Sequence, residues 1–284
     1  MAEEHRVDYH AGLIAALKAK YDDNYEFMET IKELTLGEKA PRTDAVVLKK
    51  DPSQLLTDEV GSFFNEHNVI EFKGFGDGIN SNDFYKAQGY AIMYMTIDRK
   101  VDEIPIEKVT VTVLQYRNPR ETFKKLKAKG CSISIRSKGV WEVTGPMTLF
   151  LYQVVDLDVV GKGWEAFKII IPGAKMEDIE AVQEAYEKAP DGPEKDHLGD
   201  VLRTSIESNK DTFRLLKEEG KMSEAVGVVF AEEIAKQAEA REEKIVANMI
   251  RSKQPLTYIA QMSEWPMEKL VKFAESIGYT AVAQ

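Results

Sequence analysis

Alternating apolar and polar positions in the first part of the chain predict a series of short β-strands. The clearest is segment 68–74, in which Ile70 and Phe72 alternate with Glu71 and Lys73. Side chains alternate faces along a strand, so one face is apolar and the other carries two charges. Turn-forming glycines follow the segment. Further strand-like segments are 44–48, 109–116, 132–136, 140–143 and 148–156, and residues 25–35 can hold another.

Helical periodicity appears between these strands. Apolar positions at Leu13, Ile14 and Leu17 predict an opening helix over 7–21, and a second helix begins where Asn82 or Asp83 can act as its cap. Shorter helices are expected over 58–66 and 119–129. Helices that alternate with strands in this order predict an α/β fold with a mixed sheet flanked by helices.

The pattern changes near Pro172, because the rest of the chain shows amphipathic helical spacing and almost no strand signal. We therefore expect an α/β domain over 1–172 and an all-helical region over 173–284. Residues 255–261 and 265–273 predict two short helices joined by a tight turn. A helix-turn-helix and an ordinary helical hairpin are equally compatible with them, since Glu264 stands where glycine is usual and few side chains suit base edges.

Composition limits the classes of protein that the chain can belong to. Of its 284 residues, 43 % are apolar and 30 % are charged, which is typical of a globular protein and not of a disordered one. The single cysteine, Cys131, excludes an internal disulfide and a cysteine-based zinc site. No segment resembles a signal peptide or a membrane span, so we expect a cytoplasmic protein without a membrane partner.

The net charge of −10 argues against a protein that coats nucleic acid by bulk electrostatics. Segment 117–138 is an exception, because it holds one acid, Glu121, among many basic residues. It can be a phosphate-facing patch, or the solvated face of a helix with Phe123 and Leu126 turned inward, which is the more common explanation of a charge run. The basic residues are Arg117, Arg120, Lys124, Lys125, Lys127, Lys129, Arg136 and Lys138.

A partner acid for Glu71 and Lys73 stands upstream. Asp44 opens the preceding predicted strand, and neighbouring strands can bring its carboxylate within several ångströms of that of Glu71. Like charges at that range repel unless they share a cation, and Mg²⁺ prefers such oxygen ligands. A lysine beside the pair can hydrogen-bond a metal-bound water or a phosphate oxygen. These are the components of phosphodiester hydrolysis. The glycine-rich segment 74–78, in contrast, lacks the spacing of a nucleotide-binding loop.

At these residues the chain resembles the PD-(D/E)XK nuclease superfamily, whose motif is an aspartate on one strand and Glu-x-Lys on the next. It is more specifically similar to the bacterial group of recombination-promoting nucleases and nuclease-family transposases. The segments that carry the resemblance stand in the expected order, followed by a helical tail over 205–276; they are 44–50, 68–73, 83–91, 111–114 and 118–120.

The resemblance implies a restriction-endonuclease-like sheet and a Mg²⁺ or Mn²⁺ ion held by Asp44, Glu71 and the backbone carbonyl of Phe72. It also implies that Lys73 positions or activates the attacking water, and that Gln88 on the following helix lends a polar group to the site. The chain departs from one branch of the superfamily at Ile92, where a tyrosine is expected four residues after Gln88. Additional residues that the resemblance brings into consideration are Tyr90, Glu26 and Glu29.

Two functions follow as hypotheses. The first is a metal-dependent DNA endonuclease, a hydrolase for which double-strand cleavage favours a homodimer. The second is a catalytically silent DNA-binding or protein-interaction protein that retains the nuclease fold, which the acidic balance of the chain supports. A purely structural interpretation also exists, in which Glu71 and Lys73 are a solvent-facing pair on a strand and Asp44 only begins one.

Overall fold

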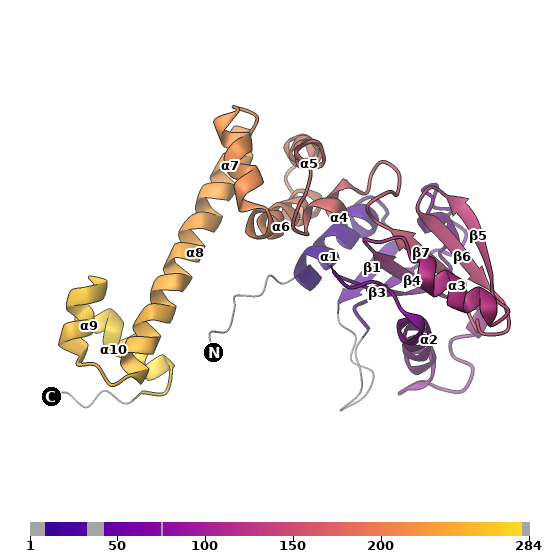
Figure 1. Ribbon diagram of the computed structural model, residues 1–284, viewed down its shortest axis with the longest axis horizontal. Helices are drawn as coiled ribbons and strands as arrows, with labels where there is room; N and C mark the ends of the chain where they lie inside the picture. The colour runs from indigo at the N-terminus through magenta and orange to yellow at the C-terminus, as the bar shows by residue number, and fades with distance from the viewer. Residues whose placement is uncertain (1–8, 33–42, 75, 280–284) are drawn as a thin grey trace. The chain divides into compact units, whose positions relative to one another are not determined.

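The computed structural model of the protein describes residues 9–32, 43–74 and 76–279 (Figure 1). The chain forms two compact units, 1–227 and 228–284, which are described separately. The mixed sheet flanked by helices and the all-helical C-terminal region are as predicted.

In the described part of the first unit, seven strands form one sheet in the order β1-β2-β3-β4-β7-β6-β5. Strands β3, β4 and β7 are mutually parallel, and every other neighbouring pair is antiparallel. The bounds are β1 Met28–Lys32, β2 Ala45–Lys49, β3 His67–Phe72, β4 Val109–Gln115, β5 Ser132–Ser137, β6 Val140–Thr144 and β7 Leu151–Asp156. The central strands β3 and β4 are almost wholly buried, which explains their density of β-branched residues.

Helices cover both faces of this sheet. On one face, α2 (Ser81–Thr96) and α3 (Arg120–Ala128) pack through Phe84 and Phe123 onto a cluster that includes Val46 and Val69. On the other face lies α1 (Tyr9–Leu17), which continues into a π-helical turn, Lys18–Asp22. Its His10 ring contacts that of Phe72 edge-on, at 6.4 Å between centroids. The first face is the one to which Glu71 points, because Glu71 and Val69 are two positions apart on β3.

The first unit also includes four helices from the later part of the chain, which pack onto its earlier elements. These helices are α4 (Glu165–Ile169), α5 (Met176–Lys188), α6 (Pro193–Ser208) and α7 (Lys210–Glu218). Between α6 and α7, the buried Asn209 amide donates to the carbonyls of Ile169 and Ile171 at 2.9 and 2.8 Å. Helix α1 crosses α6 so closely that a Cβ on Gly12 would lie 2.7 Å from Thr204.

The second unit contains most of α8 (Glu224–Arg251) and the predicted pair of short helices, α9 (Leu256–Ser263) and α10 (Met267–Ser276). Its buried core includes Val246, Ile259, Trp265 and Leu270. Glu264 ends α9 in the left-handed conformation, with φ of 58°. This is the conformation for which helix ends usually employ glycine, so the turn forms as predicted in spite of its glutamate.

Two local predictions differ from the structure. The helix expected over 58–66 is only a 3-10 turn, Gly61–Phe63, and α2 is capped by Asn80 in place of Asn82 or Asp83. In the first case Asp58 accepts the backbone N–H of Gly61, which forms a tight local turn, and Phe64 already has extended backbone. Among the described residues, no helix is long and apolar enough to cross a membrane.

Candidate functional site

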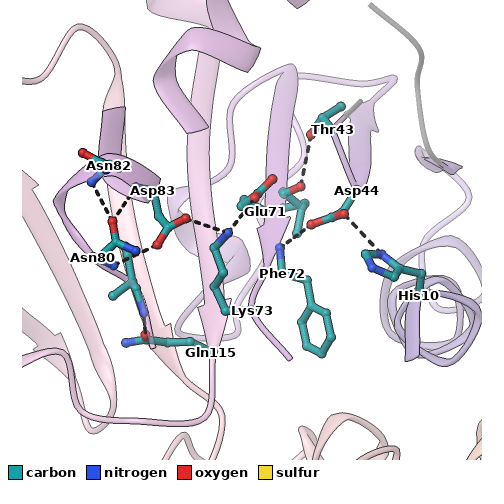
Figure 2. A network of polar contacts seen from close by, with 12 residues as sticks. His10, Thr43, Asp44, Glu71, Phe72, Lys73, Asn80, Asn82, Asp83 and Gln115 are labelled. Carbon is teal, nitrogen blue, oxygen red and sulfur yellow. Dashed lines mark hydrogen bonds and ion pairs between the residues drawn. The ribbon is translucent and has the colours of Figure 1, made fainter. Parts of the chain in front are cut away.

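Asp44 stands directly before β2, at the point where this strand stops pairing with β3. Ala45 pairs with Ile70 at the last position of the antiparallel ladder, so Asp44 stands just beyond the ladder, beside the end of β3 that carries Glu71. The Asp44 carboxylate also accepts the backbone N–H of Phe72 at 2.7 Å, replacing a strand carbonyl (Figure 2). The Asp44 carboxylate is near enough to Glu71 for its negative charge to raise the pKa of Glu71.

The other Asp44 oxygen is occupied from α1. His10 Nδ1 lies 3.2 Å from Asp44 Oδ1, and the Asp44 side chain is only 15 % exposed. Figure 2 shows His10 reaching the carboxylate from the side opposite to Phe72. Sequence analysis did not identify His10, because no local pattern links it to Asp44 and their contact depends on how α1 packs against the sheet.

Lys73 lies between two carboxylates. Its Nζ is 3.0 Å from Glu71 Oε1 and 3.0 Å from Asp83 Oδ1. The three side chains are 13 %, 6 % and 16 % exposed, in the order Lys73, Glu71 and Asp83. This excludes the interpretation of Glu71 and Lys73 as a solvent-facing pair, because neither side chain reaches bulk water to any large extent. The buried lysine is a counter-ion for both acids.

Asp83 is held in position by the start of α2. Its Oδ2 accepts the backbone N–H of Asn80 at 3.0 Å, while the Asn80 side chain accepts the N–H groups of Asn82 and Asp83 at 2.8 and 3.2 Å. This reciprocal arrangement is a capping box. The spacing Asn-x-x-Asp before an apolar helix was the sequence signal that could have fixed both the cap and the orientation of Asp83. Figure 2 shows the same carboxylate bridging the cap and Lys73.

Burial and neighbouring charge perturb the ionisable groups of the site. Burial raises the pKa of Glu71, and the negative charge of Asp44 raises it further, against the opposing effect of Lys73. For Lys73, burial acts to lower the pKa, but Glu71 and Asp83 outweigh it and the net pKa is raised. Lys73 is therefore an ammonium ion at neutral pH, suited to donate hydrogen bonds and not to accept a proton.

Tyr152, on β7, is fully buried beneath this cluster. Its pKa is raised by burial first and then by the charges of Glu71 and Asp83. Lys86, one turn into α2, carries a further positive charge that acts on Glu71. The candidate site therefore contains acids and bases in near balance, which is the usual condition for charges that have been removed from water.

The remaining predicted residues lie elsewhere. Gln88 is buried, and its amide spans the loop before β7, donating to the Met147 carbonyl at 3.1 Å and accepting the Leu149 N–H at 2.8 Å. Its catalytic role stays a prediction, and its contacts are those of a structural residue. Tyr90 is buried in the same apolar cluster as Phe84 and Val69. Glu29 pairs with Lys50 on the surface, and Glu26 is exposed.

The donor atoms of the site can be compared with the preferences of a metal ion. Within residues 9–32, 43–74 and 76–279, no group of three or more His, Cys, Asp or Glu side chains is arranged to hold a metal. The oxygen donors available as metal ligands at this site are two carboxylates and one backbone carbonyl. Lys73 N–H bonds to Leu114 on β4, so the N–H and C=O of the preceding Phe72 face β2 and Asp44. Asp44, Glu71 and the Phe72 carbonyl are oxygen donors of the kind that Mg²⁺ prefers.

Comparison with known proteins adds no assignment. No family model, no curated protein and no solved structure matches the chain. The functional interpretation therefore depends on the geometry of the residues around Asp44, Glu71 and Lys73.

Proposed function

We propose that this protein is a Mg²⁺-dependent DNA endonuclease of the PD-(D/E)XK type, hydrolysing phosphodiester bonds at Asp44, Glu71 and Lys73. The observation that carries the proposal is that Asp44, just before β2, accepts the backbone N–H of Phe72 at the end of β3 and acts electrostatically on the neighbouring Glu71. Lys73 extends from the end of the same strand toward Glu71. An aspartate and a Glu-x-Lys sequence on adjacent strands are what the motif requires.

The chain's own residues have separable tasks in this proposal. Asp44 and Glu71 provide the anionic oxygens, and the hydrogen bond from Phe72 N–H fixes the rotamer of Asp44. Lys73, being protonated, donates to a phosphate oxygen or to the attacking water and stabilises the negative charge that develops on the phosphate. A Mg²⁺ ion held by Asp44, Glu71 and the Phe72 carbonyl would supply Lewis-acid polarisation and a nucleophilic water.

The test is a plasmid-nicking assay with Glu71→Gln as the principal variant. Glutamine keeps the size of the side chain and an oxygen that accepts from Lys73, while it removes the anionic ligand. Lys73→Ala is a poorer test, because Lys73 neutralises two buried acids and its loss would affect folding. Glu66→Gln is the matched control, since Glu66 lies just before β3 and pairs with Lys108 at the surface.

We expect supercoiled DNA to be nicked with Mg²⁺ or Mn²⁺ by the wild type and by Glu66→Gln, and not by Glu71→Gln or in the presence of a chelator. Calorimetric titration of Mg²⁺ into the same proteins gives a readout that does not depend on activity. Nicking by Glu71→Gln at the wild-type rate would show that the site is wrong.

One observation favours the alternative, a catalytically silent DNA-binding or interaction protein with the same fold. The acids already have partners within the protein, since Asp44 contacts His10 and Glu71 pairs with Lys73. A protein of this kind would bind DNA without nicking it and would take up no Mg²⁺ in the calorimeter. The two functions therefore separate in the experiments above.

A further inference from the structure

Helix α3 carries three basic side chains on one side. Arg120, Lys124 and Lys127 are exposed and stand at positions i, i+4 and i+7, which share one side of a helix. We call these three residues the α3 stripe. Phe123 and Leu126 turn inward to the core, so α3 is a helix with a solvated face, as one interpretation of the sequence predicted.

The three charges of the stripe are not paired with acids in the part of the chain that the structure describes, since none of the three side chains forms an ion pair there. The exposed Lys188 and Lys221 and the half-buried Lys195, in contrast, all pair with nearby acids. In a chain of net charge −10, these three cations outnumber the single acid of α3, Glu121, and form a local positive surface. Such a surface is complementary to a polyanion.

Helix α3, which carries the stripe, is hydrogen-bonded to the segment that follows Lys73 in the chain. Thr122 on α3 donates to the carbonyl of Ile79 at 2.6 Å, and Lys129 donates to the hydroxyl of Tyr85 at 2.9 Å. Ile79 lies between Lys73 and the α2 cap, and Tyr85 lies in the first turns of α2. Helices α2 and α3 also cover the face of the sheet to which Glu71 points. The stripe and the candidate site therefore belong to one side of the first unit.

The dimensions of the stripe suit a nucleic-acid backbone. At 1.5 Å per helical residue, Arg120 and Lys127 are about 10 Å apart along α3. Phosphates follow one strand of duplex DNA at about 3.4 Å of helix axis, so this length corresponds to about three steps from one phosphate to the next. Arginine and lysine are the residues that most often make such contacts.

We propose that the α3 stripe binds the backbone of duplex DNA, beside the phosphate that the candidate site would cut. The position of the cut phosphate rests on the proposed function, whereas binding by the stripe does not. The stripe makes contacts with phosphates and none with base edges, so it contributes affinity without sequence preference.

Binding is measured by fluorescence anisotropy with a short labelled DNA duplex, in chelator, over a series of KCl concentrations. The variant is Arg120→Gln/Lys124→Gln/Lys127→Gln; glutamine is a good helix former, so α3 is retained. The control is Lys188→Gln/Lys195→Gln/Lys221→Gln, which makes the same change in net charge away from α3. A circular dichroism spectrum verifies that both are folded.

If each stripe residue meets one phosphate, the slope of log affinity against log salt falls by about 2.7, since each contact contributes about 0.9. At about 0.1 M salt this is a loss of several hundred-fold in affinity. The control should keep the wild-type slope. Equal binding by the stripe variant and the wild type, or an equal loss in the control, would overturn the proposal.

Two further measurements, vesicle binding and plasmid nicking, distinguish failure of the stripe proposal from failure of the proposed function. A wild type that binds no duplex at the lowest salt overturns the stripe proposal, as does a stripe variant that loses binding to phosphatidylglycerol vesicles and not to DNA. Plasmid nicking is scored on the same proteins. If the wild type binds through the stripe and does not nick, the proposed function fails and the stripe remains. If it nicks and the stripe variant binds normally, the stripe fails and the proposed function remains.

Discussion

Replacing Lys73 by methionine tests whether the buried cluster is held together by a single cation. The substitution keeps most of the aliphatic stem and removes the charge that lies 3.0 Å from both Glu71 and Asp83. At that distance and an effective dielectric constant of about 20, each contact corresponds to about 5 kcal/mol of Coulomb attraction. Part of this lost attraction is offset, because the variant no longer has to remove an ammonium ion from water. Breaking a buried pair by removing one partner costs about 3–5 kcal/mol, which is the loss we expect at neutral pH.

The loss should depend on pH, in a direction set by Glu71. Burial, followed by the charge of Asp44, already raises the pKa of Glu71 in the wild type, and removal of Lys73 raises it further. A carboxyl whose pKa is raised by folding contributes stability below its unfolded pKa and loses it as the pH rises through the folded value. The variant should therefore be closer to the wild type at about pH 5 than at about pH 8.

Native-state hydrogen exchange of the β3 amides is the appropriate assay, because it reports the free energy of unfolding of this sheet apart from the second unit. Lys50→Met is the control. It breaks the Lys50–Glu29 pair, whose side chains are 52 % and 48 % exposed, and should cost less than about 1 kcal/mol. A Lys73→Met protein that is no less stable than this control, or whose loss is the same at both pH values, would refute the reasoning.

Three further predictions concern single side chains. Asp44→Ala removes the acceptor of Phe72 N–H, so it should lower stability by about 1–3 kcal/mol and speed exchange of the Phe72 amide; unchanged exchange would contradict it. Gln88→Met removes two buried hydrogen bonds to the 147–149 loop and should cost a similar ~1–3 kcal/mol in urea denaturation, against no loss if the amide serves only catalysis. Glu264→Gly relieves a left-handed residue and should stabilise the α9–α10 hairpin by up to about 1 kcal/mol, measured by hydrogen exchange over 255–276; a destabilised hairpin would disprove this.

The strands and most helices were readable from the sequence because their signals are local. The alternation of apolar and polar residues at Ile70 and Phe72, and the 3.6-residue spacing of apolar residues around Phe84, depend only on which face of the strand or helix is buried. That Asp44 lies near enough to act on Glu71 was also predictable, since both stand near the facing ends of adjacent predicted strands. The 3-10 turn at Gly61–Phe63 was not, because it is short and Gly61 fits tightly against Leu56, where a Cβ would be 2.8 Å away.

The parts of the site that sequence analysis missed are those set by tertiary packing. His10 reaches Asp44 only because α1 packs against the sheet beside Phe72, and no pattern in the first helix indicates that contact. The partners of the later helices depend on packing in the same way. The amphipathic spacing of α5 to α7 shows that these helices bury one face, but it does not show which partner covers that face.

The Asp83 carboxylate takes part in two interactions at once, and this couples the binding of a ligand near Lys73 to the stability of the first turn of α2. One of its oxygens closes the first turn of α2 and the other holds Lys73. Any ligand that draws the Lys73 ammonium away leaves an uncompensated carboxylate at a helix N-terminus, where the helix dipole favours negative charge and tightens the cap. The amides of Asn80 and Asn82 therefore report on occupancy of a site that they do not themselves touch, and their exchange should slow when a ligand takes Lys73.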